Sequence, residues 1–171
     1  MKNKFEIEGD KVSVFLNRRD GTILETIIDK EDLAKIQEIS GTWYASKNKN
    51  CSYATSSTGK VYKRRQLQLH RWIMDTPEGL QVDHINHDTL DNTRSNLRNV
   101  TASENMQNLH TKPLSNSGFR GVAWHKGCGK WRALIWLNGT NAHLGLFDDV
   151  KQAAQVAHEA RIRFMPGYIH S

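Results

Sequence analysis

The chain has 171 residues, of which 37% are hydrophobic and 25% charged, and it carries a net charge of +6 at pH 7. This length allows one domain or two small ones, and the clustering of the apolar residues argues against a disordered chain. No stretch of about 18 apolar residues occurs and no apolar run follows the N-terminal lysines, so we expect neither a membrane span nor secretion.

The basic surplus is localised. Residues 1–59 carry nine Lys or Arg and nine Asp or Glu, whereas residues 60–100 carry seven against five and residues 117–171 seven against three. A localised surplus favours a polyanionic partner, although an ordinary solvated surface can have the same composition. Cys51 and Cys128 form no C-x-x-C pair for zinc and no disulfide framework, which fits a reducing cytosol. We therefore expect a cytoplasmic protein.

The first 40 residues predict a hairpin and then a short helix. Alternating stretches at 12–16 and 26–28 flank residues 19–22, where an Asp-Gly pair favours a tight turn. Asp29 is placed as an N-cap and Gly41 as the stop for apolar residues at three-residue steps, which are Leu33, Ile36 and Ile39.

The next segment predicts strands followed by a helix. Residues 43–46 and 53–55 indicate two strands around a polar loop, and residues 66–74 could continue as a helix. The basic run before that helix includes Arg64 and Arg65. These side chains could hold phosphates, or they could form an ordinary solvated charge run.

Residues 82–100 read V-D-H-I-N-H-D-T-L-D-N-T-R-S-N-L-R-N-V, and they gather groups suited to phosphodiester cleavage. One-metal cleavage of a P–O bond needs a neutral imidazole to deprotonate water and a hard cation on the scissile phosphate. Asp83 and His84 supply a carboxylate and an imidazole, and Asn92 and Asn96 add amide oxygens. The alternative is that these residues gather merely as turn formers in a polar loop.

The last third predicts a linker and a small sheet on a helix. Thr101 to Glu104 fit a capping box for a helix from Ala102 to about His110, and residues 111–118 are rich in turn formers. Three strand-like runs follow, at 119–125, 130–136 and 142–147. Asp149 then fits a capping box that starts a helix with a small-residue face, formed by Ala153, Ala154, Ala157 and Ala160.

The run from His70 through Asp83 and His84 to Asn92 and Asn96 resembles the HNH family of metal-dependent nucleases, in the subgroup found in phage and intron homing enzymes. The similarity covers about residues 66–108. It implies that a two-stranded ribbon and a helix grip one divalent cation. If the chain is phage-encoded, it would act in the cytosol of a bacterial host.

The HNH resemblance also implies roles for these residues. His84 would be the general base, Asp83 and Asn96 the metal ligands, and Asn92 the loop residue that props the histidine through backbone hydrogen bonds. His70 would have a structural or phosphate-contacting role before the ribbon. Oxygen ligands suit Mg²⁺ or Mn²⁺ better than zinc. His87 is either an extra ligand or a solvated loop histidine.

Residues 117–167 resemble the ethylene-response-factor or APETALA type of DNA-binding domain, on the runs at 117–122, 129–135 and 143–147. The resemblance implies that the three-stranded sheet lies in the major groove of DNA and that the helix backs it. Because Ala123, Trp136 and Asn141 replace arginines of the plant proteins, a base code cannot be transferred.

Alternation along the three runs predicts the two faces of this sheet. The face toward the helix would hold Val122, Trp131, Ala133, Ile135, Leu144 and Phe147. The opposite face or its hairpin turn would present DNA contacts, namely Arg120, His125, Lys126, Lys130, Arg132, Trp136 and His143. For Trp136, core packing and DNA contact stay equally open, whereas Trp124 and Trp131 favour the core.

We therefore expect an α+β chain with four parts: a supporting α+β region at 1–65, a ββα-metal HNH core at 66–110, a linker at 111–118 and an APETALA-type domain at 119–171. The expected function is a homing-type endonuclease that cuts or nicks double-stranded DNA as a monomer. One alternative is a sequence-specific DNA-binding regulator with an idle nuclease site. An RNA-binding module fits less well, because the aromatic run expected for single strands is absent.

Overall fold

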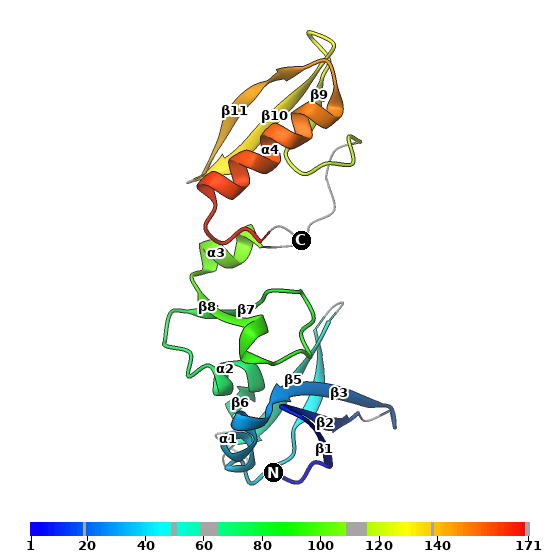
Figure 1. The fold of residues 1–171 in the computed structure, drawn as a ribbon, viewed down its shortest axis with the longest axis vertical. Helices are drawn as coiled ribbons and strands as arrows, with labels where there is room; N and C mark the ends of the chain where they lie inside the picture. The colour runs from blue at the N-terminus through cyan, green and yellow to red at the C-terminus, as the bar shows by residue number, and fades with distance from the viewer. Residues whose placement is uncertain (19, 49–50, 59–64, 109–115, 138, 170–171) are drawn as a thin grey trace. The chain divides into compact units, whose positions relative to one another are not determined.

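The computed structural model describes residues 1–18, 20–48, 51–58, 65–108, 116–137 and 139–169. Within this description the chain forms two compact units, Met1–Ala102 and Ser103–Ser171. It is a mixed α+β protein with several small antiparallel sheets and few helices, as Figure 1 shows. The predicted phosphate contact Arg64 lies outside the described residues, as do the side chain of Arg65 and most of the predicted linker.

The first sheet contains β1 (Phe5–Glu8), β2 (Lys11–Asn17) and β3 (Ile23–Asp29). The predicted hairpin is confirmed, since β2 and β3 pair antiparallel. The strand β1 adds to the other edge of β2, and its four side chains are exposed.

The predicted helix after β3 is shorter than expected. A 3-10 turn η1 (Lys30–Asp32) leads into α1 (Leu33–Gln37), which ends well before Gly41. Asp29 makes no cap bond. Its carboxylate instead accepts from Lys11 Nζ (2.5 Å) and from the backbone N–H of Arg94 (2.7 Å).

The second sheet contains β4 (Tyr44–Asn48), β5 (Cys51–Thr58) and β6 (Arg65–Gln68), in that order. The predicted helix over 66–74 was wrong in its first part, because β6 pairs with β5 and α2 (Leu69–Ile73) begins only afterwards. A two-stranded ribbon follows, made of β7 (Gln81–His84) and β8 (Leu97–Val100), with a 3-10 turn η3 (Arg94–Asn96) before β8.

One apolar core joins all three sheets of the first unit. Its fully buried members come from the N-terminal sheet, from α1 and α2, and from the segment between them, and include Val12, Val14, Leu16, Ile28, Ile36, Trp43, Leu69 and Ile73. Leu97 of β8 belongs to the same cluster. The N-terminal residues and the HNH-like segment are therefore stabilised together by burial of the same apolar surface.

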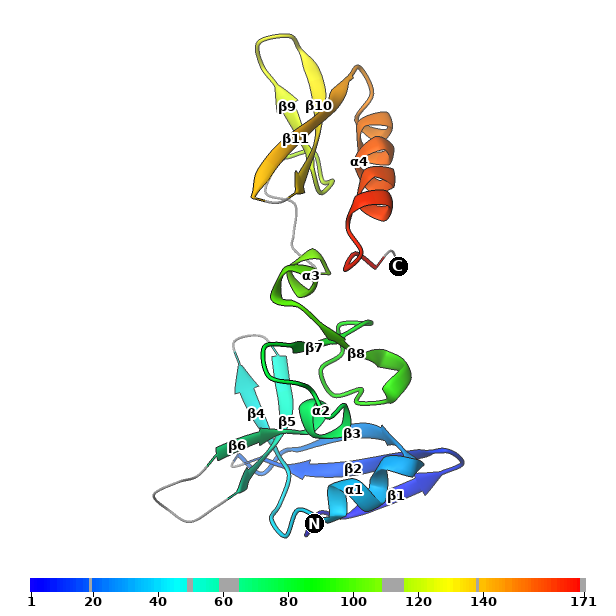
Figure 2. The same cartoon turned by 90° about the vertical axis from the view of Figure 1, so that its left-hand side faces the viewer.

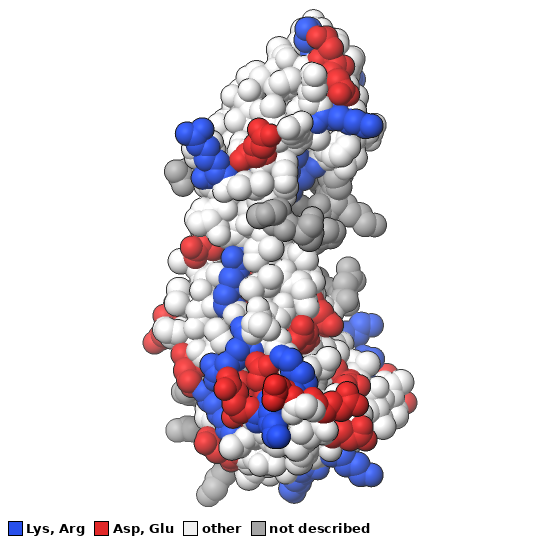
Figure 3. Space-filling view, viewed as in Figure 1, with Lys and Arg blue, Asp and Glu red and all other residues white. Residues whose placement is uncertain are grey.

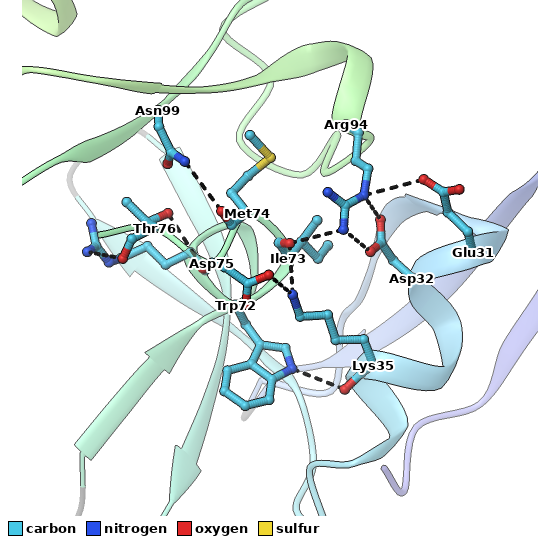
Figure 4. A network of polar contacts seen from close by, with 11 residues as sticks. Glu31, Asp32, Lys35, Trp72, Ile73, Met74, Asp75, Thr76, Arg94 and Asn99 are labelled. Atoms are coloured by element: carbon cyan, nitrogen blue, oxygen red, sulfur yellow. Dashed lines mark hydrogen bonds and ion pairs between the residues drawn. The ribbon is translucent and has the colours of Figure 1, made fainter. Parts of the chain in front are cut away.

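Ion pairs and backbone carbonyls add polar links within this unit. Figure 4 shows Arg94 donating to Asp32 through Nε (2.9 Å) and Nη2 (2.7 Å), and to the carbonyl of Ile73 (3.2 Å). Lys35 reaches the same carbonyl and Asp75. Acidic and basic side chains are interleaved over this unit in Figure 3, which agrees with its balanced N-terminal charge.

The second unit contains α3 (Ala102–Gln107), which starts at the division between the units, a three-stranded sheet and α4 (Val150–Phe164). The strands are β9 (Val122–His125), β10 (Lys130–Leu137) and β11 (Thr140–Phe147), with β10 in the centre. Asp149 caps α4, since its carboxylate accepts from the N–H of Lys151 (3.1 Å). The helix α4 lies along one face of the sheet (Figure 2).

The predicted inner face of this sheet is confirmed. All six predicted residues lie in the two apolar clusters beneath α4, where they meet small side chains of the helix. Ala153 and Ala157 are completely buried, which lets the helix approach the strands closely. The four-part division expected from the sequence stays a prediction. No helix among the described residues has the length and apolar character needed to span a membrane.

Candidate active site

Two buried side chains at the end of β7 form the centre of the candidate site. Asp83 and His84 are each 6% exposed, and in the ribbon they stand opposite Arg98 and Leu97 of β8. Because neighbouring residues on a strand point to opposite faces, the carboxylate and the imidazole leave the strand on different sides. The ribbon therefore gives each of them its own set of partners.

Asp83 is paired with an arginine across the ribbon. Nε and Nη2 of Arg98 both donate to Oδ2 of Asp83, at 2.9 and 2.7 Å. The pair is largely buried, with side chains 7% and 25% exposed. A charge-assisted bond of this kind fixes the carboxylate and compensates its loss of water. Arg98 was not identified from the sequence, although its position opposite Asp83 in a ribbon could have indicated it.

The ring of His84 is in contact with aromatic and polar side chains. Its Nε2 is 3.3 Å from Oδ1 of Asn92, and its ring packs edge-on against His70, with ring centroids 5.1 Å apart. Tyr53 contacts both imidazoles. Burial lowers the pKa of His84, while the hydrogen bond with Asn92 opposes that change. The ring is thereby held neutral at physiological pH.

The ring of His70 is more deeply buried than its predicted role in phosphate contact requires. The residue is 5% exposed, and its Nδ1 has no hydrogen-bond partner among the residues that the structure describes. Burial, with smaller contributions from His84 and Arg71, lowers the pKa of His70 to about 3. An uncharged buried imidazole supports the His84 ring by packing and does not face solvent to meet a phosphate.

The side chain of Asn92 is completely buried and bonded at both ends. While Oδ1 faces His84, Nδ2 donates to Oγ1 of Thr26 on β3 (2.7 Å). The backbone N–H of Asn92 donates to the carbonyl of Ile27 (2.8 Å). The contact with His84 is therefore made by the side chain of Asn92, and not through the backbone hydrogen bonds expected from the sequence.

The side chain of Asn96 forms hydrogen bonds with backbone groups of the loop. Its Oδ1 accepts from the N–H of Asn86 (2.9 Å), and its Nδ2 donates to the carbonyl of Asp91 (2.8 Å). Asp88 and Asp91 also bond backbone groups nearby, so that the turn-forming alternative applies to much of this loop. His87 is an exposed loop residue with a φ of +65°.

The candidate site offers few protein ligands for a divalent cation. Among the described residues, no three His, Cys, Asp or Glu side chains are grouped to hold a metal. Mg²⁺, however, commonly keeps several waters and takes one or two carboxylates plus phosphates of the substrate. The buried carboxylate of Asp83 could serve as one such ligand, whereas a zinc cage would need a fuller set of ligands.

The second unit presents most of the predicted DNA contacts on the outer face of its sheet. Register places His125 opposite Lys130, Arg132 between Ala123 and Leu146, and Trp136 opposite Asn141. Trp136 is 58% exposed, which favours contact over core packing. His143 is exposed on this face and Lys126 is exposed in the hairpin turn, while Lys130 pairs with Asp148 (3.0 Å).

Arg120 does not share that face. Its Nη1 donates to the carbonyl of Gln107 (3.0 Å), and its own carbonyl accepts from Arg161 Nη1 (2.8 Å). Burial and the nearby Arg161 lower its pKa. Arg120 thus ties α3 to the segment before β9 within the second unit. Trp124 departs in part from the expected core position, since it packs edge-on against Trp131 but is 49% exposed.

Comparison with known proteins relates the segment that holds the first of these sites to a family of nucleases. A family model described as HNH endonuclease matches residues 68–107. An HNH endonuclease of Acanthamoeba polyphaga mimivirus is 28% identical over 158 residues, which cover 89% of this chain and 75% of that protein. Protein 3.8 of Escherichia phage T7 is 33% identical over 83 residues, covering 47% of this chain and 69% of that protein. No solved structure matches the chain.

Proposed function

Since the chain is a DNA nuclease of the HNH endonuclease family, we propose that it hydrolyses phosphodiester bonds of double-stranded DNA as a homing-type enzyme. The observation that carries this proposal is the buried, neutral imidazole of His84, which is bonded to Asn92 and follows Asp83 directly in β7. A base and a hard anionic ligand on one short ribbon are the minimal protein groups that one-metal hydrolysis needs.

His84 is the proposed general base. Burial keeps its ring neutral near pH 7, so that it can take a proton from the attacking water. Asn92 and the ring of His70 hold the imidazole in one orientation. This fixed geometry lowers the entropy that must be lost when water, base and phosphate align.

Asp83 is the proposed holder of a Mg²⁺ or Mn²⁺ ion, with Asn96 as a second candidate because a carbonyl oxygen has two lone pairs. When bound, such an ion stabilises charge on the scissile phosphate and on the departing 3′ oxygen. Arg98 orients the carboxylate of Asp83 through two donors. It also places a positive charge beside the position where the DNA backbone would approach.

The outer face of the β9–β11 sheet is the proposed recognition surface for duplex DNA. It combines long basic side chains with an exposed indole, a combination that holds phosphates and packs on sugars or thymine methyl groups. We propose an APETALA-type mode for this surface and monomeric action of the enzyme. The alternative, a DNA-binding regulator with an idle nuclease site, predicts DNA binding without nicking by the wild-type protein.

The first test is nicking of supercoiled plasmid DNA with Mg²⁺ by purified variants. His84→Ala should lower the nicking rate by about 100-fold or more, because it removes the base. Its affinity for DNA should stay at the wild-type value. His87→Ala is the matched control, since it removes an exposed imidazole from the same loop. Full nicking by His84→Ala would rule out His84 as the base, and loss of nicking in His87→Ala would assign His87 to the site.

A further inference from the structure

We propose that Thr26, on the N-terminal sheet, is a positioning residue of the nuclease site, because its hydroxyl fixes the amide of Asn92 and thereby the tautomer of His84. The inference rests on the proposed role of His84 and adds a residue 66 positions before Asn92 in the chain. In this proposal the N-terminal sheet positions the catalytic base in addition to contributing to the apolar core.

The hydroxyl of Thr26 has one proton, and the structure shows where that proton goes. Oγ1 of Thr26 lies 2.7 Å from the carbonyl oxygen of Leu90, which can only accept a hydrogen bond. The proton is therefore directed to Leu90. Oγ1 must then accept from Asn92, whose amide lies 2.7 Å away and so turns Nδ2, and not Oδ1, toward Thr26.

The orientation of that amide decides which nitrogen of His84 carries a hydrogen. With Nδ2 on Thr26, Oδ1 of Asn92 faces Nε2 of His84 at 3.3 Å. A carbonyl oxygen accepts only, so Nε2 of the neutral ring is the donor and the lone pair lies on Nδ1. Nδ1 is then the atom that takes the proton from water.

The two hydrogen bonds that connect Thr26 through Asn92 to His84 form a relay, and burial protects this relay from competing partners. Thr26 and Asn92 are both fully buried, and backbone bonds on either side keep them in register. The N–H of Ile27 donates to Leu90 (2.9 Å), and the carbonyl of Ile27 accepts from Asn92 (2.8 Å). With water excluded, a reversed amide would leave buried polar atoms facing each other, which is costly.

The position of Thr26 in its strand also points to the relay. It stands opposite Val14 in a row of β2 and β3 side chains that is otherwise apolar, and Ile28 on the same face is fully buried. A buried hydroxyl costs free energy unless it is bonded. The bonds to Leu90 and Asn92 offset that cost and connect the apolar sheet with the catalytic loop.

Nuclear magnetic resonance can test the tautomer without catalysis. Two-bond ¹H–¹⁵N correlations of the His84 ring show which nitrogen carries the hydrogen. The wild-type protein and Thr26→Ser should show the Nε2–H tautomer, whereas Thr26→Val should show a mixture or the Nδ1–H tautomer. A wild-type ring with hydrogen on Nδ1, or an unchanged spectrum in Thr26→Val, would overturn the proposal.

Kinetics supply the second readout. In plasmid nicking, Thr26→Val should lower kcat by about tenfold or more with KM for DNA unchanged, and Thr26→Ser should restore kcat. Ser56→Ala is the matched control, because it removes another fully buried hydroxyl, one that donates to the carbonyl of Thr42 (3.1 Å) and not to the loop of Asn92. An equal loss of kcat in Ser56→Ala would show a general effect of destabilisation and overturn the relay.

The two proposals can fail separately. A wild-type protein that shows the Nε2–H tautomer but nicks no DNA would contradict the proposed function and still support the relay. Normal nicking by the wild type together with wild-type kcat in Thr26→Val would contradict the relay and still support the proposed function.

Discussion

In the first unit the side chains proposed to be functional are enclosed, since His84 is 6% exposed and Asn92 is fully buried, whereas Trp136 on the sheet of the second unit is 58% exposed. Enclosed groups such as Asn92 hold one orientation because their polar atoms are bonded to fixed neighbours. Exposed groups contribute charge and contact area that are realised only with a partner. Mutations should therefore affect the first unit through rate and stability, and the second through binding.

The largest expected effect comes from Asn92→Ala. This change leaves Thr26 and His84 without their shared partner inside the core. We expect kcat for plasmid nicking to fall by about 100-fold, since the base loses both its tautomer and its orientation. We also expect the free energy of unfolding to fall by about 2 kcal/mol. Chemical denaturation and single-turnover nicking measure the two effects, and wild-type values of both would contradict the idea of an enclosed site.

Acid should destabilise the first unit more than the second. An unfolded histidine has a pKa of about 6.5, while burial lowers the pKa of His70 to about 3. Between these values the unfolded chain binds more protons, so stability falls as the pH drops below about 6.5, by about 2 kcal/mol at pH 5. Burial of His84 acts in the same direction. Among the described residues of the second unit, no histidine is buried.

Hydrogen exchange resolves the two units in this experiment. Amides of β5 should lose protection between pH 7 and pH 5 relative to amides of β10, after correction for the intrinsic rate of exchange. His70→Leu should reduce this pH dependence, because it removes the buried titrating group. Equal loss of protection in both units would contradict the expectation that acid destabilises the first unit more than the second.

The sequence predicted the parts that depend on local patterns. Alternation placed the hairpin of β2 and β3 and all six inner residues of the second sheet. The helix predicted over 66–74 failed at its start because β6 pairs with β5, a non-local effect. The hydrogen bond from Asn92 to Thr26 joins residues 66 positions apart, and the hydrogen bond from Arg120 to Gln107 joins residues 13 positions apart. Periodicity and motif spacing carry no information on such partners.

A smaller effect is expected where α1 meets the nuclease segment. Arg94 donates two hydrogen bonds to the buried carboxylate of Asp32 and one to the carbonyl of Ile73 (Figure 4). Arg94→Met should cost about 1 to 2 kcal/mol of folding stability, because Asp32 is left without its donors. Arg98→Met is a useful contrast, since it should lower nicking through Asp83. Equal effects of both variants on nicking would show that the carboxylate of Asp83 has no special role.

The smallest effect on stability is expected at the exposed sheet, and there the comparison can be tested most directly. Trp136→Ala removes an indole that projects from the outer face, so the free energy of unfolding should change by less than about 0.5 kcal/mol. Affinity for duplex DNA should fall by about fivefold to tenfold, since packing on sugar or thymine methyl is lost. Arg132→Gln should weaken binding and reduce its salt dependence, because one phosphate contact is removed. Unchanged affinity and an unchanged salt dependence in both variants would place the DNA surface elsewhere on the chain.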